Sequence, residues 1–442
     1  MRIIKEDILR NLDEESIRFI YLQFTDLLGT LKAVSVPVTE IENILAGKVM
    51  FDGSSIQGFV RIEESDMCLV PDLSTFAILP WKDYPKKVAR FICYVHRPNG
   101  EPFEGDPRRI LWHAEQEASK MGYTLNVGPE MEFFLFPNGK EGKHNLELDD
   151  TADYFDLEPL DKGEDARQSI VVALQDMGFN IEASHHEAAP HQHEIDFRYD
   201  RALKSADNVM TLKAVTKVIA TQFGLQATFM PKPVYGINGS GMHVNLSLSD
   251  EKGGNAFYGP KEEHQLSLVA KQFIAGLIEH IKGITLLLNP TVNSYKRLVP
   301  HHEAPVNIAW SFANRSPLIR VPSRRENGTR IELRSPDTSA NPYLAFAAIL
   351  MAGLDGIKRN LTPPEPLTDN LYEMTEEERQ RNGVDSLPAD LGSAIKAFED
   401  DPINKEVLGD FAYQKFLQAK EAEWIAYRKQ VHPWEIDRYF NV

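Results

Sequence analysis

The stretch YTLNVGPEMEFFLF, residues 123–136, has the pattern of a β-strand and carries two acids, Glu130 and Glu132. Because successive side chains alternate across a sheet, the two carboxylates lie on the same face, about 7 Å apart along the strand. The run FFLF favours an interior strand, although an exposed edge strand with both acids facing water is the alternative. Two neighbouring carboxylates repel each other unless a cation lies between them. The stretch therefore predicts an interior strand with a cation at its polar face.

The same stretch is one of three places where a helix pattern ends in glycine and a β-prone segment follows. The other two are DMG before FNIEASHHE, ending at residue 187, and QFG before LQATFMPKP, ending at residue 233. This repeated unit predicts helices packed against one sheet whose strands carry polar residues. Ahead of the first unit, Asp106 has the position of an N-cap and Pro107 that of the first helical residue, and Gly122 closes the helix. A domain boundary is expected there, between residues 105 and 106.

Both sides of that boundary have recognisable patterns. RFIYLQFTDLLGTLKAVSV, residues 18–36, predicts two strands around an Asp-Leu-Leu-Gly turn, and KKVARFICYV, residues 86–95, predicts a third. In the second half, helices are expected at 264–282, 341–358, 389–399 and 411–429. The first hundred residues are therefore strand-rich, and the rest mixes helices and strands.

Three further segments have the alternation of a strand with one polar face. They are HEIDFRY (Glu194, Asp196 and Arg198), NGSGMHVNLSLS (His243, Asn245 and Ser247) and RIELRS (Arg330, Glu332 and Arg334). For any one strand, the simpler interpretation is that its polar residues face solvent. If all four polar faces converge, they form a site rich in carboxylates with one imidazole. That ligand set suits Mg²⁺ or Mn²⁺ better than zinc, which prefers Cys and His.

The stretch IEASHHEAAPHQHEID, residues 181–196, carries four histidines and four acids. If zinc were the target, the histidines would be the natural ligands, yet their spacing matches no usual two-histidine helix motif. If a hard cation is the target, Glu187 and Glu194 become the candidates. The histidines would then support the site without binding the metal, which is the commoner role of a histidine beside a strand.

The charge distribution restricts the partners. A formal net charge of −17 argues against nucleic acid. Between residues 296 and 334 the local net charge is positive. This segment is either a solvated charged face or a site for a small polyanion. The basic residues there are Lys296, Arg297, Arg315, Arg320, Arg324, Arg325, Arg330 and Arg334. Hard cations beside arginines suggest phosphoryl transfer, although neither a P-loop nor a dinucleotide fingerprint is present.

Other features indicate a cytoplasmic protein with no membrane partner. The start MRIIKEDILRNLDEE has no apolar signal region, and the apolar run at 343–353 is too short to span a bilayer. Cys68 and Cys93 are too few for a disulfide framework, which fits a reducing compartment.

A series of motifs points to a known family. They are FDGSSI (51–56), GPEMEFF (128–134), EASHHEAAPHQHEID (182–196), NGSGMH (238–243), NPTVNSYKRLVP (289–300), NRSPLIR (314–320) and RIELRSPDTSANPYLA (330–345). In this order they are highly specific, and the chain resembles a bacterial type I glutamine synthetase from end to end. Its length and the segment FDGSSIQGFVRIEESD resemble the Gram-positive-type subgroup, which is not controlled by adenylylation.

The resemblance implies an α+β fold. An N-terminal β-grasp domain, residues 1–105, would precede a catalytic domain, residues 106–442, with a curved antiparallel sheet and flanking helices. Twelve chains would form two stacked hexameric rings with active sites between neighbouring subunits. The implied activity is ATP-dependent ligation of ammonium to L-glutamate through γ-glutamyl phosphate, with ATP as co-substrate and two or more Mg²⁺ or Mn²⁺ ions in each site. The resemblance also implies nitrogen-regulatory transcription factors as partners.

The resemblance also implies roles for single residues. Glu132, Glu187 and Glu194 would hold one metal ion, and Glu130, His243 and Glu332 the second. Asn238, Gly239, Arg297 and Arg334 would position glutamate. Glu182 and Ser247 would contact the nucleotide, and Arg315 and Arg320 its phosphates. Asp52 and Ser55 of a neighbouring subunit would bind and deprotonate ammonium. Glu303 would lie on a flap that shields the intermediate, and Arg61 would reach that flap in a neighbour and favour inhibition by glutamine.

Some positions depart from the family pattern, and two other functions compete. The flap segment reads HHEAPVN at 301–307, whereas this subgroup more often has Gly-Tyr before the glutamate and an aromatic residue after the proline. Asn245 stands where some relatives have histidine, and Met131 replaces a proline but should point away from the metal face. One alternative function is a γ-glutamyl ligase for another amine, which the intact FDGSS disfavours. The other is a non-catalytic regulatory relative, which the complete set of carboxylates disfavours.

Overall fold

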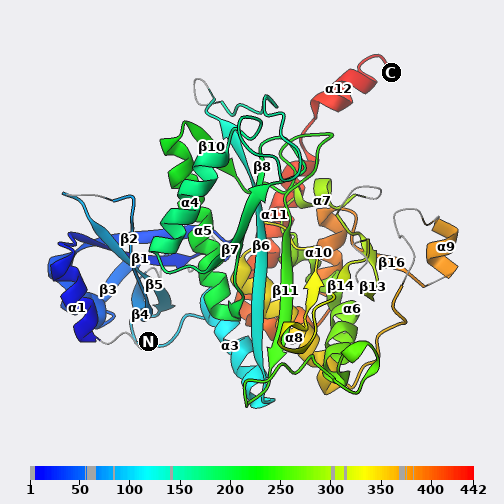
Figure 1. Cartoon of the computed structure of the whole chain (residues 1–442), viewed down its shortest axis with the longest axis horizontal. Helices are drawn as coiled ribbons and strands as arrows, with labels where there is room; N and C mark the ends of the chain where they lie inside the picture. The colour runs from blue at the N-terminus through cyan, green and yellow to red at the C-terminus, as the bar shows by residue number, and fades with distance from the viewer. Residues whose placement is uncertain are drawn as a thin grey trace.

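The computed structural model of the 442-residue chain describes residues 5–54, 56, 66–82, 85–139, 143–299, 304–312, 316–367, 374, 376–381 and 383–442. Two large sheets with their helices, and one small two-stranded sheet, make up this part of the chain (Figure 1). Four residues given roles above, Ser55, Arg61, Glu303 and Arg315, lie outside the described residues.

The N-terminal sheet has five strands in the order β2-β1-β5-β4-β3. Its elements are α1 (Lys5–Glu14), β1 (Phe19–Thr25), β2 (Leu31–Pro37), α2 (Ile41–Leu45), β3 (Val49–Asp52), β4 (Asp66–Ile78) and β5 (Val88–His96). β1 and β5 run parallel, and the other pairs are antiparallel. The predicted hairpin and third strand are confirmed. Gly29 closes the hairpin turn with φ +85°, and an added Cβ would lie 3.2 Å from the backbone of Asn341.

The second sheet has nine strands. Seven follow the order β13 (Trp310–Phe312), β14 (Ile319–Val321), β15 (Ile331–Leu333), β11 (Met242–Ser249), β6 (Thr124–Pro137), β8 (Gln192–Phe197) and β7 (Ile181–His186), while β9 (Asp200–Arg201) and β10 (Leu225–Thr228) pair with β6. Every pair is antiparallel except β13 with β14, which departs from the expected antiparallel sheet. The four strands expected to carry polar faces, β15, β11, β6 and β8, are direct neighbours, so the condition for a shared site, that their polar faces converge, is met.

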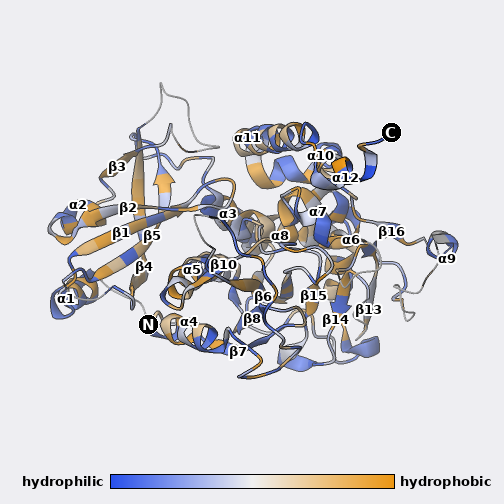
Figure 2. Cartoon of the chain, turned by 90° about the horizontal axis from the view of Figure 1, so that it is seen from above, coloured by the Kyte–Doolittle hydropathy of each residue, from blue (hydrophilic) through white to orange (hydrophobic). Residues whose placement is uncertain are grey.

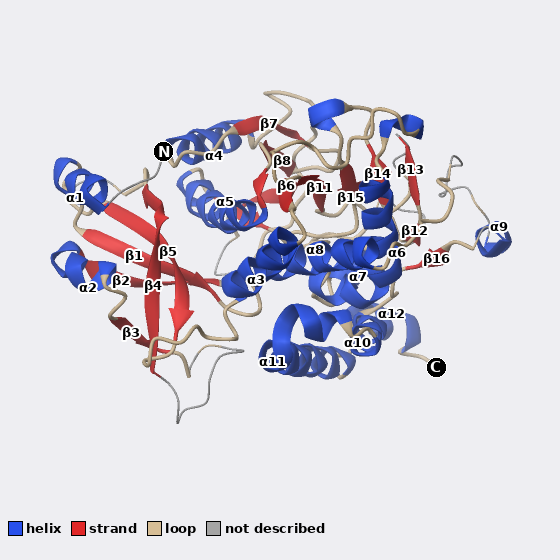
Figure 3. Cartoon of the chain, turned by 90° about the horizontal axis from the view of Figure 1, so that it is seen from below, coloured by secondary structure: helices blue, strands red, loops and turns tan. Residues whose placement is uncertain are grey.

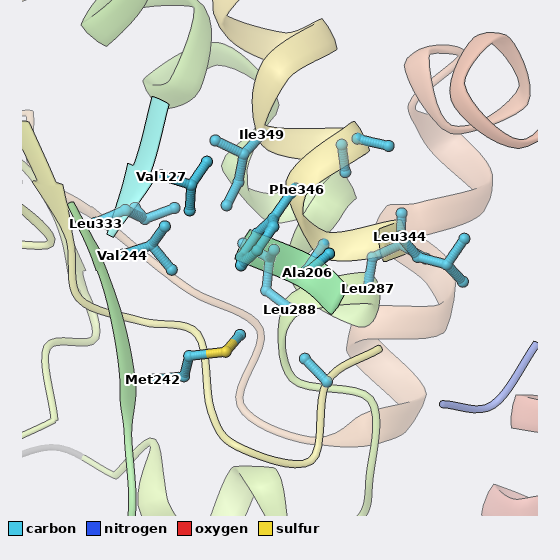
Figure 4. Close-up of a cluster of buried hydrophobic side chains, with 14 of the residues drawn as sticks. Val127, Ala206, Met242, Val244, Leu287, Leu288, Leu333, Leu344, Phe346 and Ile349 are labelled. Atoms are coloured by element: carbon cyan, nitrogen blue, oxygen red, sulfur yellow. The ribbon is translucent and has the colours of Figure 1, made fainter. Parts of the chain in front are cut away.

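Helices cover the apolar face of this sheet. They include α3 (Pro107–Lys120), α5 (Ala202–Gln222), α6 (Leu268–Leu288) and α8 (Pro342–Lys358), with α4 (Glu164–Asp176) beside β7 and α10 (Leu391–Asp400) and α11 (Ile403–Arg428) outside α6 and α8. Figure 4 shows Val127, Val244 and Leu333 of the sheet facing Phe346 and Ile349 of α8. Burying each such side chain contributes roughly 1.5–3 kcal/mol. In Figure 2 these helices lie together on one side of the sheet.

The predicted helix starts are mostly correct, with one clear difference. Asp106 caps α3 by accepting a hydrogen bond from the amide of Arg108, and Pro107 is its first residue, as predicted. The helix expected at 264–282 begins at Leu268, because the Ser267 side chain caps it by accepting from the amide of Ala270. The helix expected at 411–429 is confirmed as the second part of α11, because the non-helical backbone of Gly409 (φ +69°) divides Ile403–Arg428 into two helices.

The remaining elements are short. They are α7 (Ser294–Arg297), β12 (Asn307–Ile308), α9 (Glu376–Arg381), β16 (Asp385–Ser386) and the C-terminal α12 (Pro433–Tyr439). Cys68 and Cys93 are free thiols, in agreement with the sequence. Within the described ranges, no helix is long and apolar enough to cross a membrane.

Candidate active site

The open face of the second sheet is the face opposite the apolar one that the helices cover. The register of its strands brings the predicted acids together there. His243 of β11 lies opposite Glu130 of β6, and Glu130 lies opposite Asp196 of β8. Two residues further along β6, Glu132 lies opposite Glu194. β11 alternates strictly between buried and half-buried residues, so its polar side chains share this face. The site is therefore built on strands whose side-chain directions are fixed by the sheet.

One cluster on this face contains Glu130, His243 and Glu332. The His243 Nδ1 atom lies 3.2 Å from Glu130 Oε2 and 3.9 Å from Glu332 Oε1. One ligand atom from each of the three residues lies within 4.8 Å of the others. Asn245 donates a hydrogen bond of 2.9 Å to the other Glu130 oxygen. The donor set of two carboxylates and one imidazole at this spacing fits a divalent cation.

A second group of acids surrounds Glu132. Glu132 is 8% exposed, and its Oε2 atom accepts hydrogen bonds from the amide of Gly241 (2.8 Å) and from the side chain of Gln192 (3.1 Å). Glu194 lies across the strand pair, and Glu187 lines the same pocket as Glu132. These three carboxylates are the predicted set for one ion, and carboxylates alone suit Mg²⁺ or Mn²⁺.

Two side chains beside these three carboxylates, His185 and Asp196, had no predicted role. His185 Nε2 lies 3.4 Å from Glu194 Oε1. His185, Glu194 and Asp196 place ligand atoms within 4.8 Å of one another. The alternation in HEIDFRY had already placed Asp196 on this face beside Glu194, so the signal for it was present in the sequence.

The electrostatics show how crowded these acids are. Burial, followed by the negative charges of Glu132, Glu130 and Glu187, raises the pKa of Glu194 well above its usual range. Burial and the charges of Glu194 and Glu130 raise the pKa of Asp196 to about 9. Burial also acts to raise the pKa of Glu130, but the hydrogen bond and charge of His243 outweigh it and lower that pKa to about 2. A divalent cation among these groups would relieve the repulsion.

A pocket next to Glu132 contains the residues predicted to position an amino-acid substrate. Its lining includes Glu132, Glu187, Asn238, Gly239, His243, Arg297 and Arg334, together with Gln192 and Lys232, which had no predicted role. A Cβ at Gly239 would lie 2.2 Å from the carbonyl oxygen of Pro231, so only glycine fits there. Arg297 donates to the carbonyl oxygens of Ser335 (2.8 Å) and Arg334 (3.2 Å), which hold its guanidinium in place.

A larger pocket on the other side of Glu130 brings Glu182 and Ser247 together. Asp196 and Tyr199 also line it, with three residues of the basic segment, Arg324, Asn327 and Arg330. Arg330 donates to the Asn245 side chain (2.8 Å), and Asn245 in turn binds Glu130. Arg320 and Arg334 both form ion pairs with Glu332. Arginines thus line both pockets and contact the carboxylates, so an anionic ligand in either pocket would meet positive charge.

The remaining histidines of the stretch 181–196 are buried beneath the site. His186, His191 and His193 are buried, and the Nε2 atom of His186 lies 3.2 Å from Asp150. Asp150, Asp161 and His186 form a third compact group, but Arg167 pairs with Asp161 at 2.5 Å and contacts His193 at 2.8 Å. A guanidinium thus supplies the positive charge in this group. The expectation that these histidines support the site is consistent with these contacts.

Asp52 is not near this site in its own chain. It ends β3, is exposed, and accepts hydrogen bonds from the amide and hydroxyl of Ser54. In Figures 2 and 3, β3 lies on the side of the molecule occupied by α11, away from β6, β8 and β11. If Asp52 takes part in catalysis, it must do so in a site of another copy.

Comparisons with known proteins agree with this geometry. The sequence matches the families described as "Glutamine synthetase, catalytic domain" over residues 104–439 and "Glutamine synthetase, beta-Grasp domain" over residues 16–98. It is 54% identical to a glutamine synthetase of Clostridium saccharobutylicum over 437 residues, which cover 99% of this chain and 98% of that one. It is 55% identical to a glutamine synthetase of Staphylococcus aureus strain Mu50 over 438 residues, with the same coverage.

Two solved structures share the fold over nearly the whole chain. One, described as "GmaS/ADP complex-Conformation 1", superposes with a TM-score of 0.90 at 35% identity, covering 99% of this chain and all of the other. A cryo-EM structure of Plasmodium falciparum glutamine synthetase superposes with a TM-score of 0.88 at 27% identity, covering 99% of each chain.

Proposed function

Because the chain belongs to the glutamine synthetase family, and so is an ATP-dependent glutamate–ammonia ligase, we propose that the open face of its second sheet is the catalytic centre. The observation that carries this proposal is the register of β15, β11, β6 and β8, which puts five carboxylates and one imidazole on one face beside two pockets. The comparisons give no support to a ligase for another amine or to a non-catalytic relative.

We propose two metal sites on this face. Glu132, Glu187 and Glu194 would hold one Mg²⁺ or Mn²⁺ ion, and Glu130, His243 and Glu332 would hold another. Glu130, His243 and Glu332 form a compact group, which supports one of these sites. The repulsion between Glu194 and the acids beside it supports the other. When bound, such cations neutralise charge on ATP and on the transferred phosphoryl group.

The two pockets would bind the two larger substrates. Asn238, Gly239, Arg297 and Arg334 would hold glutamate in the pocket beside Glu132, where two guanidinium groups can meet its carboxylates. Glu182 and Ser247 would contact the nucleotide in the larger pocket, with Arg320 near its phosphates. The ADP named in the description of a structural relative supports a nucleotide site on this fold.

The proposed reaction has two steps. An oxygen of the glutamate side-chain carboxylate attacks the γ-phosphorus of ATP, and the bond to ADP breaks. Ammonia then attacks the acyl carbon, and phosphate leaves with that oxygen. Arg315 and Arg320 would face the charge that develops on the phosphoryl group. Glu303 would take a proton from the attacking ammonia while its flap excludes water.

We further propose the arrangement that the resemblance implies for the whole enzyme. The division at residues 105 and 106, the cytoplasmic location and the dodecamer of two hexameric rings belong to this proposal, as do regulatory transcription-factor partners. Asp52 and Ser55 would complete a neighbour's site by binding ammonium, and Arg61 would contact a neighbour's flap and favour inhibition by glutamine. The position of β3, away from its own chain's site, supports the shared arrangement.

An assay of phosphate release tests the proposed function. We expect phosphate and glutamine to form in equal amounts only when ATP, glutamate, ammonium and Mg²⁺ are all present. Replacing ammonium by methylamine or a polyamine at the same concentration should leave less than roughly a tenth of the rate, because the site would be built around a smaller cation. A faster reaction with one of these amines would support the other ligase, and no reaction in the full mixture would exclude a catalytic role.

A further inference from the structure

A buried polar cluster joins the N-terminal sheet to the rest of the chain. Arg108, in the first turn of α3, donates from Nε and Nη2 to the two carboxylate oxygens of Asp207 in α5, at 2.9 and 2.8 Å. The same Nη2 donates to Asp72 of β4 at 2.9 Å. The Arg108 and Asp207 side chains are only 4% and 3% exposed. In Figure 3, α3 lies between the N-terminal sheet and α8. One guanidinium therefore connects the two parts of the molecule.

Neighbouring contacts hold this guanidinium in one orientation. The Tyr343 hydroxyl of α8 donates to Asp207 at 2.8 Å. The ring of Tyr94 in β5 lies under Arg108, with 4.4 Å between the guanidinium carbon and the ring centre. Asp106 accepts from the amides of Val95 and Arg108, both at 3.0 Å, and so links β5 to the start of α3. Charge-assisted bonds among buried groups have strong geometric requirements, so the cluster fixes an angle as well as a contact.

The Asp72 carboxylate is aimed at Arg108 by a bulge in β4. The register between β4 and β5 shifts after Asp72 and resumes at Ala77. Within this irregular stretch, the amide and hydroxyl of Ser74 both donate to Asp72 Oδ1, at 3.0 and 2.6 Å. These bonds leave Oδ2 to face Arg108. Bulges re-aim side chains in this way without ending the strand.

β4 connects this contact to Asp52. Asp66, at the start of β4, lies opposite Asp52 of β3, and Asp72 lies six residues further along the same strand. Six residues of a strand span about 20 Å. From Cys68 to Asp72 the strand is paired with β5 without a break, so it cannot easily bend. A tilt of β4 at Asp72 would consequently move Asp52, which is paired with the other end of this strand.

We propose that Asp72 and Arg108 are positioning residues that set the angle of the N-terminal sheet, so that Asp52 reaches the site of the neighbouring subunit. This inference rests on the shared site proposed above. Other hydrogen bonds should keep the sheet attached when the ion pair is lost. Asn341 donates to the carbonyl oxygens of Asp26 (3.2 Å) and Leu27 (3.3 Å), and Arg90 of β5 donates to the Thr211 hydroxyl of α5 (3.2 Å). Losing the Asp72 contact alone would therefore change the orientation of the sheet and would not release it.

The first test is the kinetics of Asp72→Asn. Asp207 still pairs with Arg108 in this variant, so no buried charge is left alone and the chain should fold. We expect kcat/KM for ammonium to fall roughly 10- to 100-fold, the effect of about 1 Å of misplacement, while KM for glutamate and ATP stays unchanged. Ser74→Ala, at an exposed residue that orients Asp72, should give a smaller change in the same direction. Glu15→Gln, which breaks the exposed pair with Lys87 in the same part of the chain, is the matched control and should change nothing.

Subunit mixing separates this role from a general defect. Asp72→Asn subunits are mixed with inactive Glu332→Ala subunits, whose N-terminal sheet is intact. Sites that combine an Asp72→Asn catalytic domain with a Glu332→Ala N-terminal sheet should recover the wild-type KM for ammonium. If every active site in the mixture keeps the raised KM, the defect acts within its own subunit and the positioning role is wrong.

A control mixture tells this failure apart from a failure of the shared site. Asp52→Ala and Glu332→Ala subunits are mixed in the same way. If this control pair recovers activity while the Asp72→Asn mixture keeps its raised KM, the shared site stands and only the positioning inference is overturned. If the control pair recovers nothing after confirmed subunit exchange, the shared site itself is wrong, and the inference is overturned with it.

Discussion

Replacing Glu132 by glutamine is expected to lower turnover by about 10²- to 10⁴-fold, because a bound cation contributes several kcal/mol to such a reaction and one of its anionic ligands would be lost. The substitution keeps the shape of a side chain that is 8% exposed and hydrogen-bonded to Gly241 and Gln192. The amide oxygen can still accept from Gly241, so the local fold should survive. The rate of glutamine formation at saturating Mg²⁺ is the measurement.

A matched control makes this result specific. Glu117→Gln removes the same charge from a half-buried position on α3, outside the proposed site, where Glu117 forms an i,i+3 ion pair with Lys120. It should retain full activity. Both variants should melt near the wild-type temperature, and metal-free Glu132→Gln should not be less stable, because one charge that repels Glu194 is gone. Near-normal turnover in Glu132→Gln would show that this carboxylate does not hold a required cation.

Mixing two inactive variants is expected to restore activity. Asp52→Ala should lack the group that binds ammonium, and Glu332→Ala should lack a metal ligand, so each alone is expected to be nearly inactive. If sites form between subunits, random exchange of equal amounts should produce about one quarter of the wild-type activity, from interfaces that pair two intact halves. The measurement is glutamine formation before and after subunit exchange.

The structural reason for this expectation is the distance of β3 from the metal face of its own chain (Figure 2). Mixing Asp52→Ala with a second preparation of Asp52→Ala controls for exchange itself and should restore nothing. Exchange must be shown independently, for example by mass after differential labelling. If exchange is complete and the mixed pair stays inactive, Asp52 does not act in a neighbour's site.

The local pattern predicted much of the site because the relevant signal is the alternation of side chains along a strand. In NGSGMHVNLSLS the apolar residues are buried and the polar residues half-buried in β11, as expected. The prediction that Met131 points away from the metal face is also confirmed, since it is fully buried in the core. RIELRS forms only the short β15, Ile331–Leu333, yet Glu332 reaches the predicted cluster.

What the local pattern could not predict depends on contacts between distant segments. Alternation says which residues share a face, but not that β11 lies between β15 and β6 in the sheet. Arg108 and Asp207 are 99 residues apart, and no spacing rule connects them. The pocket residues Gln192 and Lys232 come from separate loops and strand ends, so only the folded chain brings them beside Glu132. The short helix that begins at Ile403 and ends at the non-helical Gly409 (φ +69°) was not predicted, whereas the longer helix after that glycine was.

One face of the second sheet is expected to hold at least two divalent cations for each subunit. Equilibrium dialysis of the purified, metal-stripped enzyme against Mn²⁺, without nucleotide, measures this number directly. We predict two or more ions bound to each wild-type subunit at saturation, and one fewer in Glu132→Gln. One ion or none in the wild-type enzyme, or an unchanged number in Glu132→Gln, would contradict the claim.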